Sequence, residues 1–326
     1  MLQALLQIVM LLCLQPLLAF QVTPDMVYRG VVSVHEVQPM LAMRSKLPAS
    51  PACIRANLSI DLSFSREELL ITSEGLAVPT VGGSNLLASW AELEDIAGRK
   101  KGSCFALYED GAVPYLVSGI SEKTKNPGSL YCANAGAPTM ILGGFTMHRI
   151  AGENMSPTID TSHKIASLPL HRDATVLDTC CGLGYTSIEA AKKGCKVTTI
   201  EYDPLSLELC HYNPWSRALF DGSIAVKVGD ACELVRSMPD GGFSYVVHDP
   251  PARNLCNTDL YGLDFYRDLR RVLKTNGQLY HYIGNPASKE SGKLFAGIIN
   301  RLGEAGFSSI RKVDAAFGLV ACASKR

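Results

Sequence analysis

The sequence of 326 residues lacks several features that identify common classes of protein. Its eleven cysteines include no Cys-x-x-Cys pair, so a zinc ribbon or thioredoxin-like redox site finds no support, and we predict no metal site. Basic and acidic side chains balance at 31 each, so the chain lacks the basic excess that is usual in proteins that bind nucleic acids. A local basic patch is still compatible with this balance. The unpatterned cysteines are typical of buried thiols in a reducing compartment.

Charge is missing altogether from residues 1–20, which are apolar for most of their length and interrupted by Pro16. A cleaved signal-like segment fits this run better than a permanent membrane anchor. Residues 21–56 are rich in Pro, Ser, Val and Ala without a clear period, and we expect a transit-like or disordered segment there. The junction after Phe20 resembles plastid presequences of algae with secondary plastids. This predicts a plastid protein that contacts membranes only before processing; an ER, secretory or membrane-anchored protein is the alternative.

The next part of the chain, residues 57–150, has a different pattern and no catalytic motif. Segments such as NLSIDLSF and ELLITSEGLAV alternate apolar and polar residues, as half-buried strands do. LASWAELEDIAGRK predicts one amphipathic helix that ends near Gly98. We therefore expect a small β-rich accessory domain here.

Residues 151–326 alternate strands and helices, which predicts a doubly wound, Rossmann-like α/β sheet. After the last expected helix, SSIRKVDA and GLVACAS predict a C-terminal β-hairpin. Four consecutive strands end at or just before an acid, namely Asp178, Glu201, Asp230 and Asp249. Ligands of such sheets bind at the carboxyl ends of the strands. These acids predict a ligand that is positive or rich in hydrogen-bond donors.

The loop after the first of these strands, DTCCGLGYTS, contains Gly182 and Gly184. Glycine lets the backbone approach a ligand closely, and the following helix offers free N–H groups. Ser187 stands where a dinucleotide fingerprint has its third glycine, which argues against NAD(P). S-adenosylmethionine (SAM) has no phosphate, but it has a ribose, an adenine amine, a sulfonium and an ammonium, which suit the acids. The C-terminal hairpin is also typical of class I SAM-dependent methyltransferases.

Several motifs in order, VLDTCCGLGYTSIEAA, TIEYDP, NPWSR, GDACELV and HDPP, resemble an uncharacterised, largely archaeal family of predicted class I SAM-dependent methyltransferases. The family is sometimes grouped with spermidine-synthase-like proteins. The resemblance covers about residues 57–326 and is strongest over 147–290. It implies that the loop from Asp178 to Gly184 holds the methionine part of SAM. In detail, it implies cofactor contacts by Asp178, Thr179, Cys180, Gly182, Gly184, Tyr185, Thr186, Glu201 (ribose), Tyr202 (adenine side), Asp230 and Ala231 (adenine edge), Asp249 (methyl) and Pro250.

Asp249 is the first catalytic candidate, because the two prolines that follow it fix the position of a carboxylate that can hold an acceptor or its proton. In amino-methylating enzymes an aromatic residue follows such an Asp-Pro-Pro run, whereas Ala252 stands here, which puts a planar amine in doubt. His281 and His148 are the other catalytic candidates. His248 is expected to point into the helix layer instead. The group His148, Arg149, Asp160, Thr161 and Lys164 matches the family pattern and predicts either a lid over the cofactor or a purely structural cluster.

Three functions remain open from the sequence. The first is a SAM-dependent methyltransferase whose acceptor is a small molecule, an RNA or a protein. The second is an aminopropyltransferase that uses decarboxylated SAM, although the loop PPARNLCNTD has only one acid and such enzymes need an acidic polyamine site. The third is a SAM-fold binding module without catalytic activity.

Overall fold

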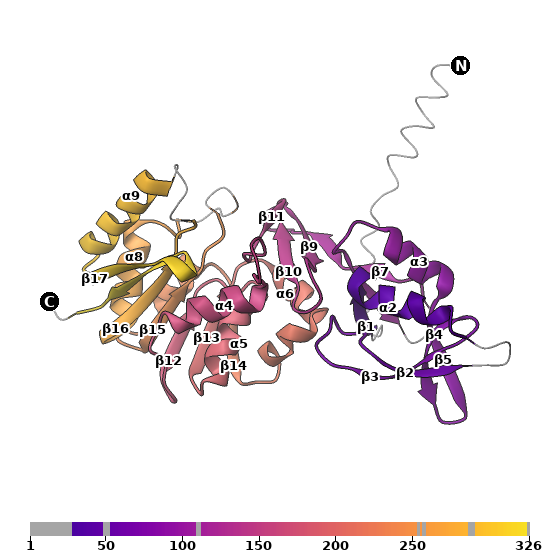
Figure 1. Cartoon of the computed structure of the whole chain (residues 1–326). Helices are drawn as coiled ribbons and strands as arrows, with labels where there is room; N and C mark the ends of the chain where they lie inside the picture. The colour runs from indigo at the N-terminus through magenta and orange to yellow at the C-terminus, as the bar shows by residue number, and fades with distance from the viewer. Residues whose placement is uncertain are drawn as a thin grey trace, which may run out of the picture.

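The computed structural model describes residues 28–47, 53–108, 112–252, 255, 259–285 and 291–324. The predicted signal-like segment 1–20 lies outside the described residues. In Figure 1 the N-terminal strands lie at one end of the molecule and the large C-terminal sheet at the other. None of the helices in the described residues is long and apolar enough to cross a membrane.

The prediction of a transit-like or disordered segment over residues 21–56 is wrong for its described part. β1 (Tyr28–Ser33) pairs antiparallel with β6 (Cys104–Tyr108), and α2 (Val34–Arg44) follows directly. Ser33 and Glu36 form a capping box at the start of α2, and Val31 and Met40 are completely buried. The folded accessory part thus begins by Tyr28, not at residue 57. The six-residue strand and the proline inside α2 at position 39 concealed the period.

The accessory part is strand-rich, as the sequence predicts, and consists of three small sheets with strand orders β1-β6-β7, β2-β3-β4-β5 and β11-β10-β9-β8. The predicted helix is α3, which ends at Gly98. The remaining elements are β2 (Ile54–Leu58), β3 (Glu67–Ile71), β4 (Gly75–Thr80), β5 (Gly83–Ser89), α3 (Trp90–Gly98), β7 (Tyr115–Leu116), β8 (Ser118–Ile120), β9 (Pro127–Tyr131), β10 (Thr139–Leu142) and β11 (Phe145–Thr146).

The second part confirms the predicted doubly wound sheet with a C-terminal hairpin. Its seven strands have the order β14-β13-β12-β15-β16-β18-β17, and β18 runs antiparallel to both of its neighbours, β16 and β17. The elements are α4 (Pro157–Ala166), β12 (Thr175–Asp178), α5 (Tyr185–Lys192), β13 (Lys196–Glu201), α6 (Pro204–His211), η1 (Pro214–Leu219), β14 (Ile224–Val228), α7 (Ala231–Ser237), β15 (Phe243–His248), α8 (Leu263–Val272), β16 (Leu273–Tyr282), α9 (Ser291–Glu304), β17 (Ser308–Val313), η3 (Asp314–Ala316) and β18 (Gly318–Cys322).

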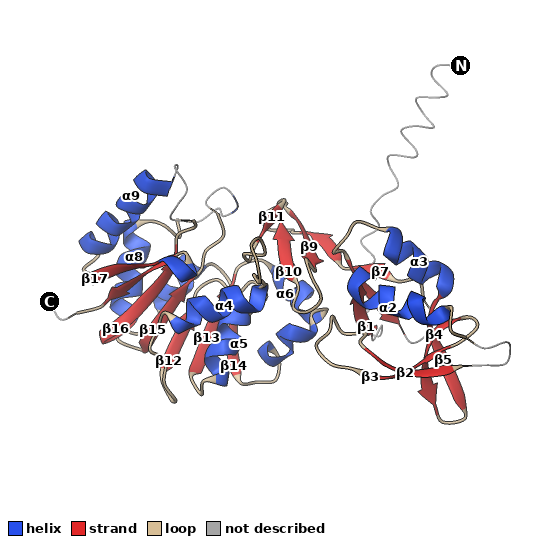
Figure 2. Cartoon of the chain, in the orientation of Figure 1, coloured by secondary structure: helices blue, strands red, loops and turns tan. Residues whose placement is uncertain are grey.

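Alternation along the strands separates two cores, one on each face of this sheet. Figure 2 shows the strands of the sheet together with the helices that flank it. Val176 and Val247 pack with Ile188 of α5 on one face. Their neighbours Leu177 and Val246 pack with residues of α8 and α9 on the other. The strands are therefore buried on both sides, which leaves their carboxyl ends as the open edge of the sheet.

The accessory part shares one of these cores. Buried Val31, Leu62 and Leu130 belong to the same cluster as Val176. The Trp215 indole in η1 donates a hydrogen bond to the carbonyl of Leu62 at 3.0 Å. In addition, β8 and β9 pack against α6, the helix that follows the carboxyl end of β13.

Candidate functional site

One cavity of about 940 Å³ lies at the carboxyl ends of β12, β13, β15 and β16 and reaches under the hairpin of β10 and β11. Such a volume is at the upper end of the range for small-molecule sites, which leaves room for a cofactor and an acceptor together. The structure brings most of the predicted site residues to this cavity. Those in its lining are His148, Thr179, Cys180, Gly182, Tyr185, Thr186, Glu201, Tyr202, Ala231, Asp249 and Pro250.

Asp178 was predicted to contact the ligand, but it does not line the cavity. Its carboxylate instead joins the end of β12 to the start of α5, beneath the glycine loop. Its carboxylate is completely buried and accepts hydrogen bonds from the hydroxyls of Thr186 and Ser187, both at 2.7 Å. Burial raises the pKa of Asp178 to about 6. Gly184 is structural as well: its φ is +77°, and a Cβ there would lie 2.3 Å from Leu219.

Glu201 joins the glycine loop to the end of β13. Oε2 accepts a hydrogen bond from the backbone N–H of Gly182, and Oε1 accepts one from Asp203, both at 2.8 Å. Burial raises the pKa of Glu201 to about 7. Each carboxylate oxygen keeps a second lone pair, so Glu201 can still accept hydrogen bonds from two hydroxyls of a ligand. Tyr202 lines the cavity next to it.

The side chain of Asp230 has a different role from the predicted adenine contact. It is the N-cap of α7, where it accepts a hydrogen bond from the N–H of Cys232 at 2.7 Å. Its neighbours Gly229 and Ala231 line the cavity, and Asp230 does not. The end of β14 was predicted correctly, but the Asp230 carboxylate caps α7 and does not face the cavity.

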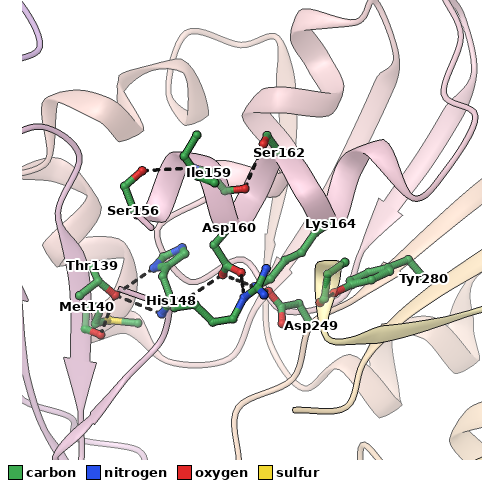
Figure 3. Close-up of polar contacts among 12 residues, drawn as sticks. Thr139, Met140, His148, Ser156, Ile159, Asp160, Ser162, Lys164, Asp249 and Tyr280 are labelled. Carbon is green, nitrogen blue, oxygen red and sulfur yellow. Dashed lines mark hydrogen bonds and ion pairs between the residues drawn. The ribbon is translucent and has the colours of Figure 1, made fainter. Parts of the chain in front are cut away.

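At the other end of the cavity, Asp249 belongs to a row of alternating charges that we call the charge chain: Asp249, Lys164, Asp160 and Arg149. Figure 3 shows the first three side chains pointing toward one another. The Lys164 ammonium lies 2.6 Å from Asp249 Oδ2 and 3.0 Å from Asp160 Oδ2. Arg149 pairs with the other oxygen of Asp160. Lys164 is 1% exposed and Asp160 0%, so both are removed from water.

The pKa shifts show that Lys164 and Asp160 stabilise each other's ionised forms. Burial lowers the pKa of Lys164, but the Asp249 and Asp160 carboxylates outweigh burial and raise it above its ordinary value. Burial raises the pKa of Asp160, but the opposite effect of Lys164 and Arg149 is larger. The pKa of Asp160 therefore lies below its ordinary value. The pKa of Asp249 is raised by burial, which Lys164 opposes. The Lys164 ammonium therefore lies between two carboxyl groups, each with an oxygen in contact with it.

Sequence reasoning left the role of this group open between a lid and a structural cluster. A signal was present: Asp160, Thr161, Lys164 and Ile165 recur on one face of α4 at helical spacing, and all four are buried. Two opposite charges four residues apart on a buried face indicate an internal ion pair, because unpaired charges are not buried.

His148 is placed at the cavity, as predicted. Its Nδ1 lies 3.0 Å from Thr139 Oγ1, and its ring packs on Tyr185 with 5.1 Å between the centroids. Burial, with a further contribution from Lys164, lowers the pKa of His148 to about 3. The imidazole is therefore neutral at physiological pH and can orient a hydrogen-bonding group of a ligand.

The prediction of His281 as a catalytic residue is wrong. Its side chain points to the face of β16 that packs against α8 and is 0% exposed. Its Nε2 lies 2.8 Å from the hydroxyl of Tyr266. Burial lowers its pKa well below the ordinary value. His248, its partner in register on β15, points the same way, as expected.

His248 nevertheless supports the site. Its Nε2 lies 2.9 Å from the carbonyl of Leu260, so this nitrogen donates and Nδ1 accepts from the hydroxyl of Thr179 at 2.7 Å. The ring thus ties together two segments that line the cavity. Sequence reasoning missed this role because it depends on the register between β12 and β15.

Two further features of the lining concern chemistry and shape. Burial raises the pKa of the Cys180 and Cys181 thiols well above the ordinary value, so neither is a thiolate nucleophile.

The part of the lining that comes from the β10–β11 hairpin and the following loop, which we call the roof, is largely apolar: Met140, Leu142, Phe145, Met147 and Met155. The roof was missed because its residues have no motif of their own.

Comparison with known proteins identifies relatives of the second part. Residues 158–293 match the family model described as the methyltransferase small domain. The uncharacterized protein MJ1233 of Methanocaldococcus jannaschii is 43% identical over 185 residues, which cover 56% of this chain and 63% of that protein. The predicted resemblance to an uncharacterised archaeal protein is therefore confirmed, and the matched segment is similar to the methyltransferase small domain.

A probable cobalt-precorrin-6B C(15)-methyltransferase (decarboxylating) of Pyrobaculum aerophilum is 36% identical over 78 residues, or 23% of this chain and 39% of that protein. The chain thus spans less than two thirds of the length of either relative. A crystal structure of spermidine synthase with the transition state analogue AdoDATO aligns with a TM-score of 0.51 and 17% identity, covering 65% of this chain and 77% of that chain. At this identity the alignment shows a shared fold.

Proposed function

We propose that this chain is a SAM-dependent methyltransferase that methylates a small, largely apolar acceptor held beside Asp249. The observation that carries the proposal is the position of Glu201, a buried carboxylate anchored to the glycine loop inside the same cavity as Asp249. The methyltransferase small domain matched by residues 158–293 contains both acids and the loop. A SAM-fold module without activity would bind the same cofactor but would not turn it over.

The residues present fit the cofactor. Gly182 has φ of +54° and open space where a Cβ would lie, so its backbone can approach a ligand closely. Glu201 would accept hydrogen bonds from the two ribose hydroxyls, and the loop from Thr179 to Gly182 would hold the methionine part. Bound SAM supplies an electrophilic methyl group on a sulfonium.

Asp249 aligns the acceptor. Within the described residues its ion pair uses Oδ2, which leaves Oδ1 to accept an O–H or N–H hydrogen bond from the acceptor and to hold the proton that leaves it. Lys164 lowers the pKa of that carboxyl group against the effect of burial and fixes it in place. Positioning of this kind contributes much of the rate of a transfer between two bound molecules. His148 gives the acceptor a second, neutral hydrogen-bonding partner.

The roof favours a small molecule among the possible acceptors. Its methionines adapt to apolar ligands of irregular shape, and Arg149 is the one Arg or Lys among the described residues that line the cavity. A nucleic acid would require cationic residues along its path. Arg149 faces the cavity, but its guanidinium is engaged by Asp160 and by the carbonyl of Ala315 at 2.7 Å.

Binding of S-adenosylhomocysteine, the product of methyl transfer, tests the cofactor directly. We expect the wild type to bind it in isothermal titration, and Glu201→Gln to bind it at least about tenfold more weakly, because the amide is uncharged and its NH2 group cannot accept a hydrogen bond from the second ribose hydroxyl. Glu233→Gln is the matched control, since Glu233 is exposed in the first turn of α7. Absence of binding by the wild type, or equal affinities of Glu201→Gln and wild type, would contradict the proposal.

The raised pKa of Glu201 predicts a pH dependence of that binding. Ribose hydroxyls donate to the ionised carboxylate, so the bound ligand lowers a pKa that is about 7 in the free protein. Binding should therefore release protons near neutral pH, and affinity should rise as the pH increases through about 7. Titrations in two buffers of different ionisation enthalpy measure the proton release. It should be reduced in Glu201→Gln; proton uptake by the wild type would contradict the assignment.

A further inference from the structure

Lys164 occupies a position that a cationic substrate would need. Its Nζ lies 2.6 Å from Asp249 Oδ2, on the carboxylate at the acceptor end of the cavity. The side chain is 1% exposed and comes from α4, behind the cavity lining. Asp249 is therefore already paired with an ammonium that belongs to the protein itself.

The other contacts of Lys164 hold the ammonium in place. Asp160 Oδ2 lies 3.0 Å away, and the ring of Tyr282 lies under the ammonium with 4.8 Å to its centroid. Asp160 is in turn fixed by Arg149 and by the backbone N–H of that residue at 3.3 Å. Two carboxylates and an aromatic face are the groups that bind an alkylammonium ligand.

We propose that Lys164 determines acceptor specificity: it takes the place of a substrate ammonium at Asp249, excludes cationic amines, and restricts the enzyme to acceptors that are uncharged at the reacting atom. This inference rests on the proposed function and specifies its acceptor class. A second cation beside Asp249 would meet the charge of Lys164 at close range, and like charges at a buried site are strongly unfavourable. An uncharged O–H or N–H meets no such penalty and can still donate to Asp249.

The spermidine synthase fold makes the distinction concrete, because the chain shares that fold and an aminopropyltransferase needs to bind an amine. The aminopropyltransferase alternative predicts that a diamine binds the wild type. The inference predicts that it does not, and that removal of Lys164 creates an amine site. Asp160 would remain paired with Arg149 in such a variant, which leaves Asp249 as the free carboxylate.

The experiment is a titration of putrescine into wild type and Lys164→Met, each with and without S-adenosylhomocysteine. We expect no measurable binding by the wild type, and affinity in Lys164→Met that is at least about tenfold higher, from one new charge-assisted hydrogen bond. Butanediol, the uncharged analogue of putrescine, is the matched control ligand and should show no gain. The double variant K164M/D249N should lose the gain, with circular dichroism verifying that it is folded.

Lys164→Gln is the second variant in case Lys164→Met does not fold. Its amide still donates a hydrogen bond to Asp249 but has no charge, so it should also gain affinity for putrescine. Putrescine binding by the wild type as tight as by either variant would overturn the inference, and so would a folded variant without any gain. Failure of the wild type to bind S-adenosylhomocysteine would instead overturn the proposed function, and the putrescine titrations without it would still decide the role of Lys164.

Discussion

Replacing Asp160 by alanine should lower the free energy of unfolding by about 3–5 kcal/mol, the cost of removing one partner from a buried ion pair. Asp160 is 0% exposed and lies between two cations, Lys164 and Arg149. Its loss leaves Lys164 with Asp249 alone and separates Arg149 from its carboxylate. Urea denaturation followed by circular dichroism measures the change.

Asp95→Ala is the control for this prediction. Asp95 pairs with Arg99 four residues along α3, and both side chains are more than half exposed, at 57% and 61%. An exposed helical pair of this kind contributes only about 0.3–0.5 kcal/mol. Similar losses in the two variants would show that the charge chain is not a buried network.

The second large effect is expected for Asp178→Ala. Thr186 and Ser187 would each keep a buried hydroxyl without its acceptor, which costs about 1–3 kcal/mol for each group. The free energy of unfolding should therefore fall by about 2–6 kcal/mol. Because both hydroxyls fix the start of α5 to the glycine loop, affinity for S-adenosylhomocysteine should also fall by about tenfold or more. Urea denaturation and isothermal titration measure the two effects.

Asp178→Asn separates the hydrogen bonds from the charge. Its amide oxygen still accepts from the two hydroxyls, so most of the stability should return. Burial raises the folded-state pKa of Asp178 from 3.8 to about 6, so the folded protein binds the proton more tightly than the unfolded chain. The stability from this group is present below pH 3.8 and is lost as the pH rises through about 6. The asparagine variant should lack that loss; an unchanged pH profile would contradict the burial of Asp178.

The cofactor half of the site was predictable because its signals are local. Parallel strands bring their carboxyl ends to one edge, so acids at the strand ends had to gather there, and Glu201 and Asp249 do. Which acids face the ligand was not predictable. Asp178 turns below the loop and Asp230 caps a helix, and both roles depend on the rotation of a side chain that the strand pattern does not specify.

The acceptor half was less accessible to sequence reasoning because it is assembled from distant segments. Lys164 reaches Asp249 across 85 residues, and the roof comes from a hairpin in the strand-rich part. His281 was misplaced by its proximity to the strand end, although alternation alone decides its face. The buried β1 and α2 were mistaken for a transit-like segment because amino-acid composition was given more weight than their short apolar runs.

The position of the roof outside the matched segment has a consequence for how the cavity can change in related chains. Met140, Leu142, Phe145 and Met147 lie outside residues 158–293, whereas the glycine loop, Glu201 and Asp249 lie inside. Substitutions in one short hairpin can therefore change the apolar lining of the cavity and leave the glycine loop, Glu201 and Asp249 unchanged.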